Sequence, residues 1–189
     1  MSKIWFTSDT HYGHANIIKY CNRPFKDVEE MNQALITNYN SVVRPEDTVY
    51  HLGDFAFMPV DKVLSILSRL NGNKFLMFGN HDKVIRGAVG AFKPKFHTIS
   101  DYMEINVDGT KIVMCHYPML TWNGSGRGSI MLHGHAHGNT NYGHLKDAKI
   151  LDVGVDCHNY FPLSADDMFR IMSKKIAEDY GRNRERREM

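Results

Sequence analysis

The chain has 189 residues, of which 42% are apolar and 23% are charged, and its formal net charge is +2 at pH 7. It contains no run of about 18 apolar residues, which excludes a transmembrane helix and a membrane partner, and its first residues lack the apolar core of a signal peptide. The small net charge does not by itself indicate a polyanionic partner, and the three separated cysteines form neither a disulfide framework nor a zinc motif, so we expect a cytoplasmic protein.

The first half of the chain alternates between short apolar runs and longer segments with helical periodicity. Strands are expected at residues 4–8, 48–52 and 74–78, and helices at residues 27–43 and 59–70. Asp27 occupies the N-cap position of the first helix, and Asn71-Gly72 ends the second. This strand–helix–strand–helix–strand order predicts an α/β fold with parallel pairing.

The second half has a different pattern, in which strands follow one another more closely. Residues 102–107 and 111–115 are separated by Asp108-Gly109, a strong hairpin signal. Further strands are expected at residues 130–132 and 149–153, and a helix at 165–178. We therefore expect a mostly antiparallel sheet packed on the α/β half. Residues 1–189 are predicted to form a single domain with a basic, frayed tail at 181–189.

Polar side chains follow the expected strands at the points where these strands end. The clusters are Asp9-Thr10-His11, Gly53-Asp54, Gly79-Asn80-His81-Asp82, Cys115-His116 and Gly134-His135-Ala136-His137. Sites in open α/β sheets form at the carboxyl ends of the parallel strands, so the first three clusters should converge. Carboxylates, an amide oxygen and imidazoles are ligands for divalent cations such as Mn²⁺, Fe²⁺ or Zn²⁺.

These clusters together carry a family resemblance. Their order along residues 9–137 resembles the calcineurin-like metallophosphoesterase superfamily, and the full set of motifs is specific where any one alone would be common. The resemblance implies two packed mixed β-sheets flanked by helices, in a four-layer α/β/β/α sandwich. It also implies metal-dependent hydrolysis of phosphoric esters.

The resemblance further implies a role for each motif residue. One cation would be held by Asp9, His11, Asp54 and His137, and the second by Asp54, Asn80, His116 and His135. Asp54 would bridge them. His81 would protonate the leaving oxygen or steady the phosphoryl transition state, and Asp82 would orient His81. The cofactors would be two divalent ions among Mn²⁺, Fe²⁺, Zn²⁺ and Ni²⁺, of which we favour Mn²⁺. Because imidazolium cannot bind metal, activity should fall below about pH 6.

Several other polar residues have less specific patterns. His14, Arg23 and Arg127 are candidate substrate contacts. His14 follows the first metal motif, and the guanidinium groups of the two arginines suit phosphate. The glycine-rich segment around Arg127 also lies between two metal motifs. His51 fits a core position or one behind the ligands. His133 fits the site or a position beneath it.

We expect the substrate to be a small phosphate ester, a phosphodiester or a phosphomonoester. We favour a nucleotide-derived phosphodiester, because a chain of this size has no added domain for docking a protein or a long nucleic acid. The alternatives are a nuclease on DNA or RNA served by the basic tail, a phosphoprotein phosphatase, and a non-catalytic scaffold. The oligomeric state, the native metal and the exact ester stay open.

Overall fold

The computed structural model describes residues 2–177, and the predicted basic tail at 181–189 lies outside them. The first sheet is built from β1 (Ile4–Thr7), β2 (Thr48–His51), β3 (Asn73–Met77), β4 (Thr98–Ser100) and β9 (Leu163–Ser164), in the order β4-β3-β2-β1-β9. Strands β1 to β4 pair in parallel and β9 pairs antiparallel with β1. The predicted parallel α/β half is therefore confirmed.

The second sheet contains β5 (Tyr102–Val107), β6 (Thr110–Cys115), β7 (Ile130–His133) and β8 (Ile150–Asp152), in chain order. The β5–β6 hairpin is antiparallel, and its turn residues Asp108 and Gly109 have φ of 49° and 79°, as a two-residue turn requires. Pairing is parallel from β6 to β7 and from β7 to β8. The prediction of a mostly antiparallel sheet is wrong, because long segments carry the chain back to the starting edge before β7 and β8.

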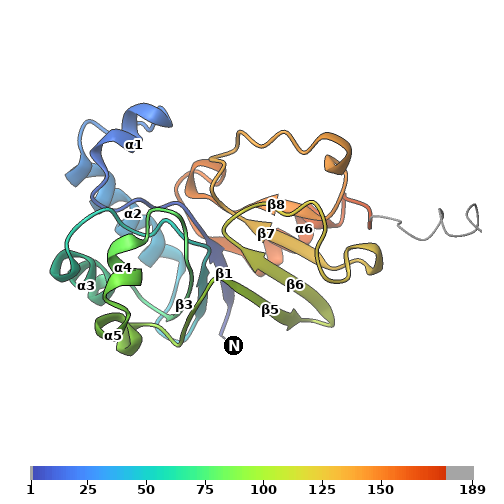
Figure 1. The fold of residues 1–189 in the computed structure, drawn as a ribbon, viewed down its shortest axis with the longest axis horizontal. Helices are drawn as coiled ribbons and strands as arrows, with labels where there is room; N and C mark the ends of the chain where they lie inside the picture. The colour runs from blue at the N-terminus through green and yellow to red at the C-terminus, as the bar shows by residue number, and fades with distance from the viewer. Residues whose placement is uncertain (1, 178–189) are drawn as a thin grey trace, which may run out of the picture.

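Helices gather against one face of the first sheet, as Figure 1 shows for α1 to α5. Their bounds are α1 (Ala15–Tyr20), α2 (Val28–Val42), α3 (Val60–Arg69), α4 (Lys83–Gly87) and α5 (Val89–Phe92), and α6 (Ala165–Met172) follows β9. Short 3₁₀ turns are found at η1 (Lys93–Lys95), η2 (Ser125–Arg127), η3 (Gly143–Leu145) and η4 (Val155–Cys157). No helix within residues 2–177 is long and apolar enough to cross a membrane.

The last helix is shorter than predicted. It ends at Met172, whereas the apolar pattern suggested a helix to residue 178. The chain turns after Met172, and the backbone N–H of Ile176 donates to the carbonyl of Asp147 at 2.9 Å. The apolar residue that appeared to extend the helix instead joins a bridge beside Ala148.

The core lies in layers set by strand alternation. Trp5 and Leu76 of the first sheet face the helices, while Phe6 of the same sheet belongs to a second cluster with Ile112 and Leu132 of the other sheet. The outer face of the second sheet packs against the loop residues and 3₁₀ turns that follow β6 and β7. These two mixed sheets flanked by helices confirm the predicted fold class.

Candidate metal centre

The loops that follow five strands meet at one edge of the two sheets. Because β1, β2 and β3 run in parallel, the loops that begin at Asp9, Asp54 and Asn80 leave the first sheet on the same side. The loops after β6 and β7 supply His116 and the His135-Ala136-His137 segment from the second sheet. The predicted ligands thus come from two sheets and converge at the joint between them.

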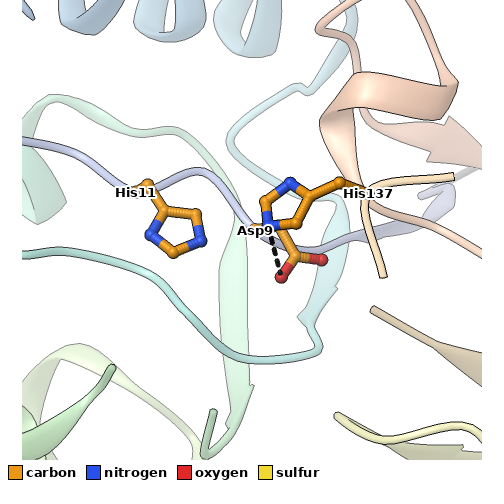
Figure 2. A group of neighbouring side chains, drawn as sticks. All are labelled: Asp9, His11 and His137. Carbon is orange, nitrogen blue, oxygen red and sulfur yellow. Dashed lines mark ion pairs between the residues drawn. The ribbon is translucent and has the colours of Figure 1, made fainter. Parts of the chain in front are cut away.

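The first group consists of Asp9, His11 and His137, whose ligand atoms all lie within 4.8 Å of one another. Figure 2 shows the His137 ring facing the Asp9 carboxylate, with 4.0 Å between Nε2 and Oδ1, while His11 lies on the loop that carries Asp9. His11 Nε2 is buried and has no hydrogen-bond partner among residues 2–177. An orphaned imidazole nitrogen beside a carboxylate is suited to bind a cation.

The second group consists of Asn80, His116 and His135. The Asn80 Oδ1 atom lies 3.0 Å from Nε2 of His116 and 3.0 Å from Nδ1 of His135. His116 Nδ1 donates to the carbonyl oxygen of Leu52 at 2.8 Å, and burial lowers the pKa of this histidine. Nε2 of the neutral ring therefore keeps its lone pair, so two acceptor atoms face each other where a cation would satisfy both.

Asp54 stands between the two groups. Its Oδ2 atom lies 3.5 Å from Nε2 of His11 and 3.6 Å from Nε2 of His116. Its Oδ1 atom accepts a hydrogen bond from the backbone N–H of His81 at 2.8 Å. One carboxylate oxygen is thus held in place by the backbone while the other faces imidazoles from both groups.

The backbone is strained at most of these positions. The φ angle is 56° at Asp9, 52° at His11, 54° at Asp54, 70° at His135 and 48° at His137, in the left-handed region that residues with a side chain rarely adopt. Each such residue costs on the order of 1–3 kcal/mol and persists only where the surroundings hold it. The clustering of this strain on the candidate ligands supports a functional role for the site.

Glycines allow the loops to approach one another closely. A Cβ atom on Gly79 would meet the carboxylate oxygen and the backbone nitrogen of Asp54, and one on Gly134 would meet Ser8 and Asp9. Both positions therefore exclude any side chain.

The electrostatics favour a cation. Burial raises the pKa of the Asp9 carboxyl to about 8, although His137 opposes the shift. Burial alone would lower the pKa of His137, but hydrogen bonds to Asp156 and Cys21 and the charge of Asp9 raise it to about 10. The buried carboxylates that favour a protonated His137 would equally favour a divalent cation. The oxygen and imidazole ligands of the site fit such ions.

Comparison with known proteins identifies the family. The model of the calcineurin-like phosphoesterase family matches residues 2–182. The chain belongs to this family. It is a metal-dependent phosphoric ester hydrolase, and the family implies divalent metal ions as cofactors.

Relatives of this phosphoesterase are similar over nearly their full lengths. An uncharacterized protein of Methanocaldococcus jannaschii is 41% identical over 183 residues, which cover 92% of this chain and 93% of the relative. The gene 66 protein of Mycobacterium phage L5 is 28% identical over 207 residues, covering 96% of this chain and 99% of that one. The solved structure of a protein of unknown function from Aquifex aeolicus matches with a TM-score of 0.73 and 31% sequence identity. The match covers 90% of this chain and 100% of that one.

The structure corrects the role predicted for Asp82 in the phosphoesterase. Its carboxylate accepts hydrogen bonds from the backbone N–H groups of Asp54, Phe55 and Gly79, each at 2.8 Å. Burial raises its pKa to about 6 against these hydrogen bonds. Asp82 ties the loop after β2 to the loop after β3, so it positions Asp54 rather than the ring of His81.

Arg23 is not a substrate contact. Its guanidinium is fully buried and forms a two-pronged ion pair with Asp156, with both N–O distances 2.8 Å. It also donates to the backbone oxygens of Asp9 and Thr10. Asp156 Oδ2 in turn lies 2.6 Å from Nδ1 of His137. The arginine therefore supports the first ligand group from behind, and no donor is left for a phosphate.

Asp156 is a positioning residue that the sequence analysis missed. It follows β8 by a few residues, just as the recognised motifs follow their own strands. The same strand-end argument applied to β8 would have found it.

Arg127 is also wrongly predicted as a substrate contact. Arg127 precedes β7, whereas the candidate ligands His135 and His137 follow it. The two segments therefore lie at opposite ends of that strand. Arg127 lines a hollow with Gly109 and Thr110 of the β5–β6 turn. Arg127 therefore lies beside the β5–β6 turn, at the other end of β7 from the candidate ligands.

His14 lies next to the first ligand group. Its Nδ1 atom is 3.2 Å from Nδ1 of His11, and its ring lies 5.8 Å from the ring of His81. His51 and His133, whose positions the sequence left open, have partners inside the protein. His51 contacts Thr10 Oγ1 at 3.0 Å, and His133 contacts the Tyr142 hydroxyl at 2.8 Å. Both are buried, so His133 lies beneath the site rather than in it.

Exposed aromatic side chains flank the centre, and no sequence pattern predicted them. Phe57 is 53% exposed and stacks on His14 with 4.8 Å between ring centroids. Tyr117 is 47% exposed and packs edge-on against His116 and His135. Exposed rings of this size beside a catalytic centre are candidate surfaces for a planar substrate group.

Proposed function

We propose that this phosphoesterase hydrolyses a small nucleotide-derived phosphodiester with two divalent cations, of which we favour Mn²⁺. The position of Asp54 carries the proposal, because one carboxylate oxygen lies 3.5 and 3.6 Å from imidazole nitrogens of the two ligand groups. A carboxylate shared between two sets of ligands is what a two-metal site requires.

The proposed ligands follow the two groups. The first cation is held by Asp9, His11, Asp54 and His137, and the second by Asp54, Asn80, His116 and His135. The bound cations supply positive charge that neutralises the phosphoryl oxygens and activates water for in-line attack.

His81 is the proposed proton donor to the leaving oxygen. Its ring lies 5.3 Å from the ring of His11 in an edge-on arrangement, and its backbone N–H holds Asp54 Oδ1. One imidazole therefore faces the reacting region from the same loop that fixes the shared carboxylate. General acid catalysis of this kind contributes about 10²–10⁴-fold to a rate.

Two observations favour a nucleotide-derived diester over a monoester. The arginines considered for binding a doubly charged phosphate are not available, since Arg23 is buried in an ion pair and Arg127 lies at the far end of β7. The exposed rings of Phe57 and Tyr117 offer apolar surfaces to the groups esterified to the phosphate. Nucleobases suit such surfaces because they stack on aromatic rings.

The test compares bis-p-nitrophenyl phosphate with p-nitrophenyl phosphate, using protein stripped of metal and then supplied with Mn²⁺. We expect cleavage only with Mn²⁺ and a higher kcat/KM for the diester. Asp54→Asn should abolish turnover, and His81→Ala should lower kcat by about 10²–10⁴-fold. Asp61→Asn is the matched control, because Asp61 is exposed on α3. A preference for the monoester, or metal-independent turnover, would contradict the proposal.

A further inference from the structure

A cavity of about 400 Å³ adjoins the second ligand group. Its lining includes Asn80, Lys83, Arg86, Asp101 and Tyr117. A volume of this size lies within the range of small-molecule sites. Since Asn80 belongs to the proposed ligand set, a substrate whose phosphate lies at the centre can extend directly into this cavity.

Tyr117 forms a fixed aromatic wall of the cavity. Its ring packs edge-on against His116 and His135, with centroids 5.0 and 4.7 Å away, and its hydroxyl lies 3.5 Å from Asn80 Oδ1. These contacts hold the ring in place while 47% of the residue remains exposed. An aromatic ring that is already positioned loses little freedom when a planar group stacks on it.

The cavity also carries one uncompensated positive charge. Lys83 is the first residue of α4, and its side-chain ammonium forms no hydrogen bond or ion pair within residues 2–177. Arg86, on the same helix, lies 3.9 Å above the Phe78 ring and pairs with Asp101, so its charge is already balanced. An anionic group entering the cavity would therefore be attracted to Lys83.

We propose that this cavity binds a nucleotide unit that carries a second phosphate beyond the one cleaved. Tyr117 stacks the base and Lys83 binds the second phosphate. The inference rests on the proposed function and narrows its substrate class to nucleotide esters with two phosphates on one nucleoside. Dinucleotides with a terminal phosphate and the ends of single strands share this chemistry.

The kinetic test uses thymidine 5′-(p-nitrophenyl phosphate) with and without a 3′-phosphate, in the presence of Mn²⁺. We expect wild-type protein to prefer the 3′-phosphorylated ester by about tenfold in kcat/KM, the size of one charge-assisted hydrogen bond. Lys83→Ala should bring this ratio close to one. The control Lys62→Ala alters an exposed lysine on α3 and should keep the ratio.

The aromatic wall is tested on the same substrates. Tyr117→Ala should raise KM for both thymidine esters by about tenfold, because stacking of a base contributes about 1–3 kcal/mol. Tyr117→Phe keeps the ring and removes only the hydroxyl, so it should retain most of the binding. Equal losses in both variants would overturn the stacking role.

A binding measurement separates the cavity from the chemistry of hydrolysis. Isothermal titration of the Mn²⁺-loaded protein with thymidine 3′,5′-bisphosphate and with thymidine 5′-monophosphate should show tighter binding of the bisphosphate in wild type and not in Lys83→Ala. Equal affinities in wild type would overturn the cavity proposal even if bis-p-nitrophenyl phosphate is cleaved. Selective binding without cleavage of any diester would instead contradict the proposed function. Competition by a dinucleotide and by oligothymidylate distinguishes a small substrate from a strand end.

Discussion

At the scale of single residues, the candidate ligands are supported by a second set of buried side chains. Arg23 is the main example, since its guanidinium joins Asp156 to the backbone of Asp9 and Thr10. Burial raises the pKa of Asp156, but hydrogen bonds from His137 and Arg23 outweigh that effect and lower it. The arginine thus keeps a carboxylate charged directly behind a candidate ligand.

Removing this arginine should destabilise the protein strongly. In Arg23→Ala the buried Asp156 carboxylate loses its partner, and breaking a buried ion pair in this way costs about 3–5 kcal/mol. Urea unfolding measures the loss. The matched control is Arg170→Ala, because Arg170 forms a solvent-exposed ion pair with Asp167. Loss of this pair should lower the free energy of unfolding by at most about 1 kcal/mol. Equal losses in the two variants would contradict the supporting role of Arg23.

Gly79 makes a different contribution, by leaving space. In Gly79→Ala the new methyl group would collide with Asp54, so this carboxylate must move away from its position between the groups. We expect the affinity for Mn²⁺ to fall at least about tenfold, as it does when residues that orient metal ligands are changed. Isothermal titration calorimetry measures this affinity. Gly90→Ala is the control, because nothing lies within 4 Å of a Cβ there. Unchanged affinity in Gly79→Ala would show that the loop relaxes freely.

At the scale of elements, local signals decide which parts of the fold are predictable. Asp27 was predicted to cap α2, and its side chain accepts from the backbone N–H of Glu30 at 2.8 Å. The helix is further fixed by Lys26, whose N–H donates to the Glu30 carboxylate. Both contacts are set by neighbouring residues and are therefore visible in the sequence.

Loss of this cap should have a modest effect on stability. Asp27→Ala removes one hydrogen bond at the start of α2 and should lower the free energy of unfolding by about 1 kcal/mol. Thermal or urea unfolding provides the measurement. Asp27→Asn retains an accepting oxygen and should lie within a few tenths of a kcal/mol of wild type. A loss in the asparagine variant as large as that in the alanine variant would show that the charge, not the hydrogen bond, matters.

Elements without a strong local pattern were missed. β9 and β4 are too short to show alternation, and the direction of β7 depends on the path of the preceding loop. Strand direction in the second sheet is decided by tertiary packing, which a local pattern does not contain. The same limit explains Arg127, whose position depends on the end of β7 from which its loop leaves.

The candidate ligands were easier to predict than their surroundings. Each lies directly after a strand, so parallel pairing alone brings most of them to one edge. Asp156 and Tyr117 gain their positions from contacts made across the folded chain. Both residues also follow strands, but the side chains that they contact are decided by the folded chain, and a family motif covers only the candidate ligands themselves.

At the scale of the whole molecule, the candidate centre spans the joint between the two sheets. Asp9, Asp54 and Asn80 follow strands of the first sheet, and His116 and His135 follow strands of the second. A cation bound by both sets belongs to the folded state alone, since an unfolded chain does not hold these residues together. Metal binding should therefore stabilise the entire fold.

This linkage predicts a shift in melting temperature. Mn²⁺ at about 100 times its Kd should add about 2.7 kcal/mol, which corresponds to a rise of about 5–10 °C in Tm for a protein of this size. Calorimetry on chelator-treated protein with and without Mn²⁺ measures the rise. Asp54→Asn should show a much smaller rise. An equal rise in this variant would place the stabilising ion somewhere else.

The division of the ligands between the sheets also has a consequence for biosynthesis. The ribosome releases Asp9, Asp54 and Asn80 well before His135 and His137, and β9 completes the first sheet only after all of them have emerged. Chains fold from the amino-terminal end as they are made. We therefore expect a nascent or prematurely terminated chain to lack hydrolytic activity, so that phosphate esters are hydrolysed only once the whole centre has been assembled.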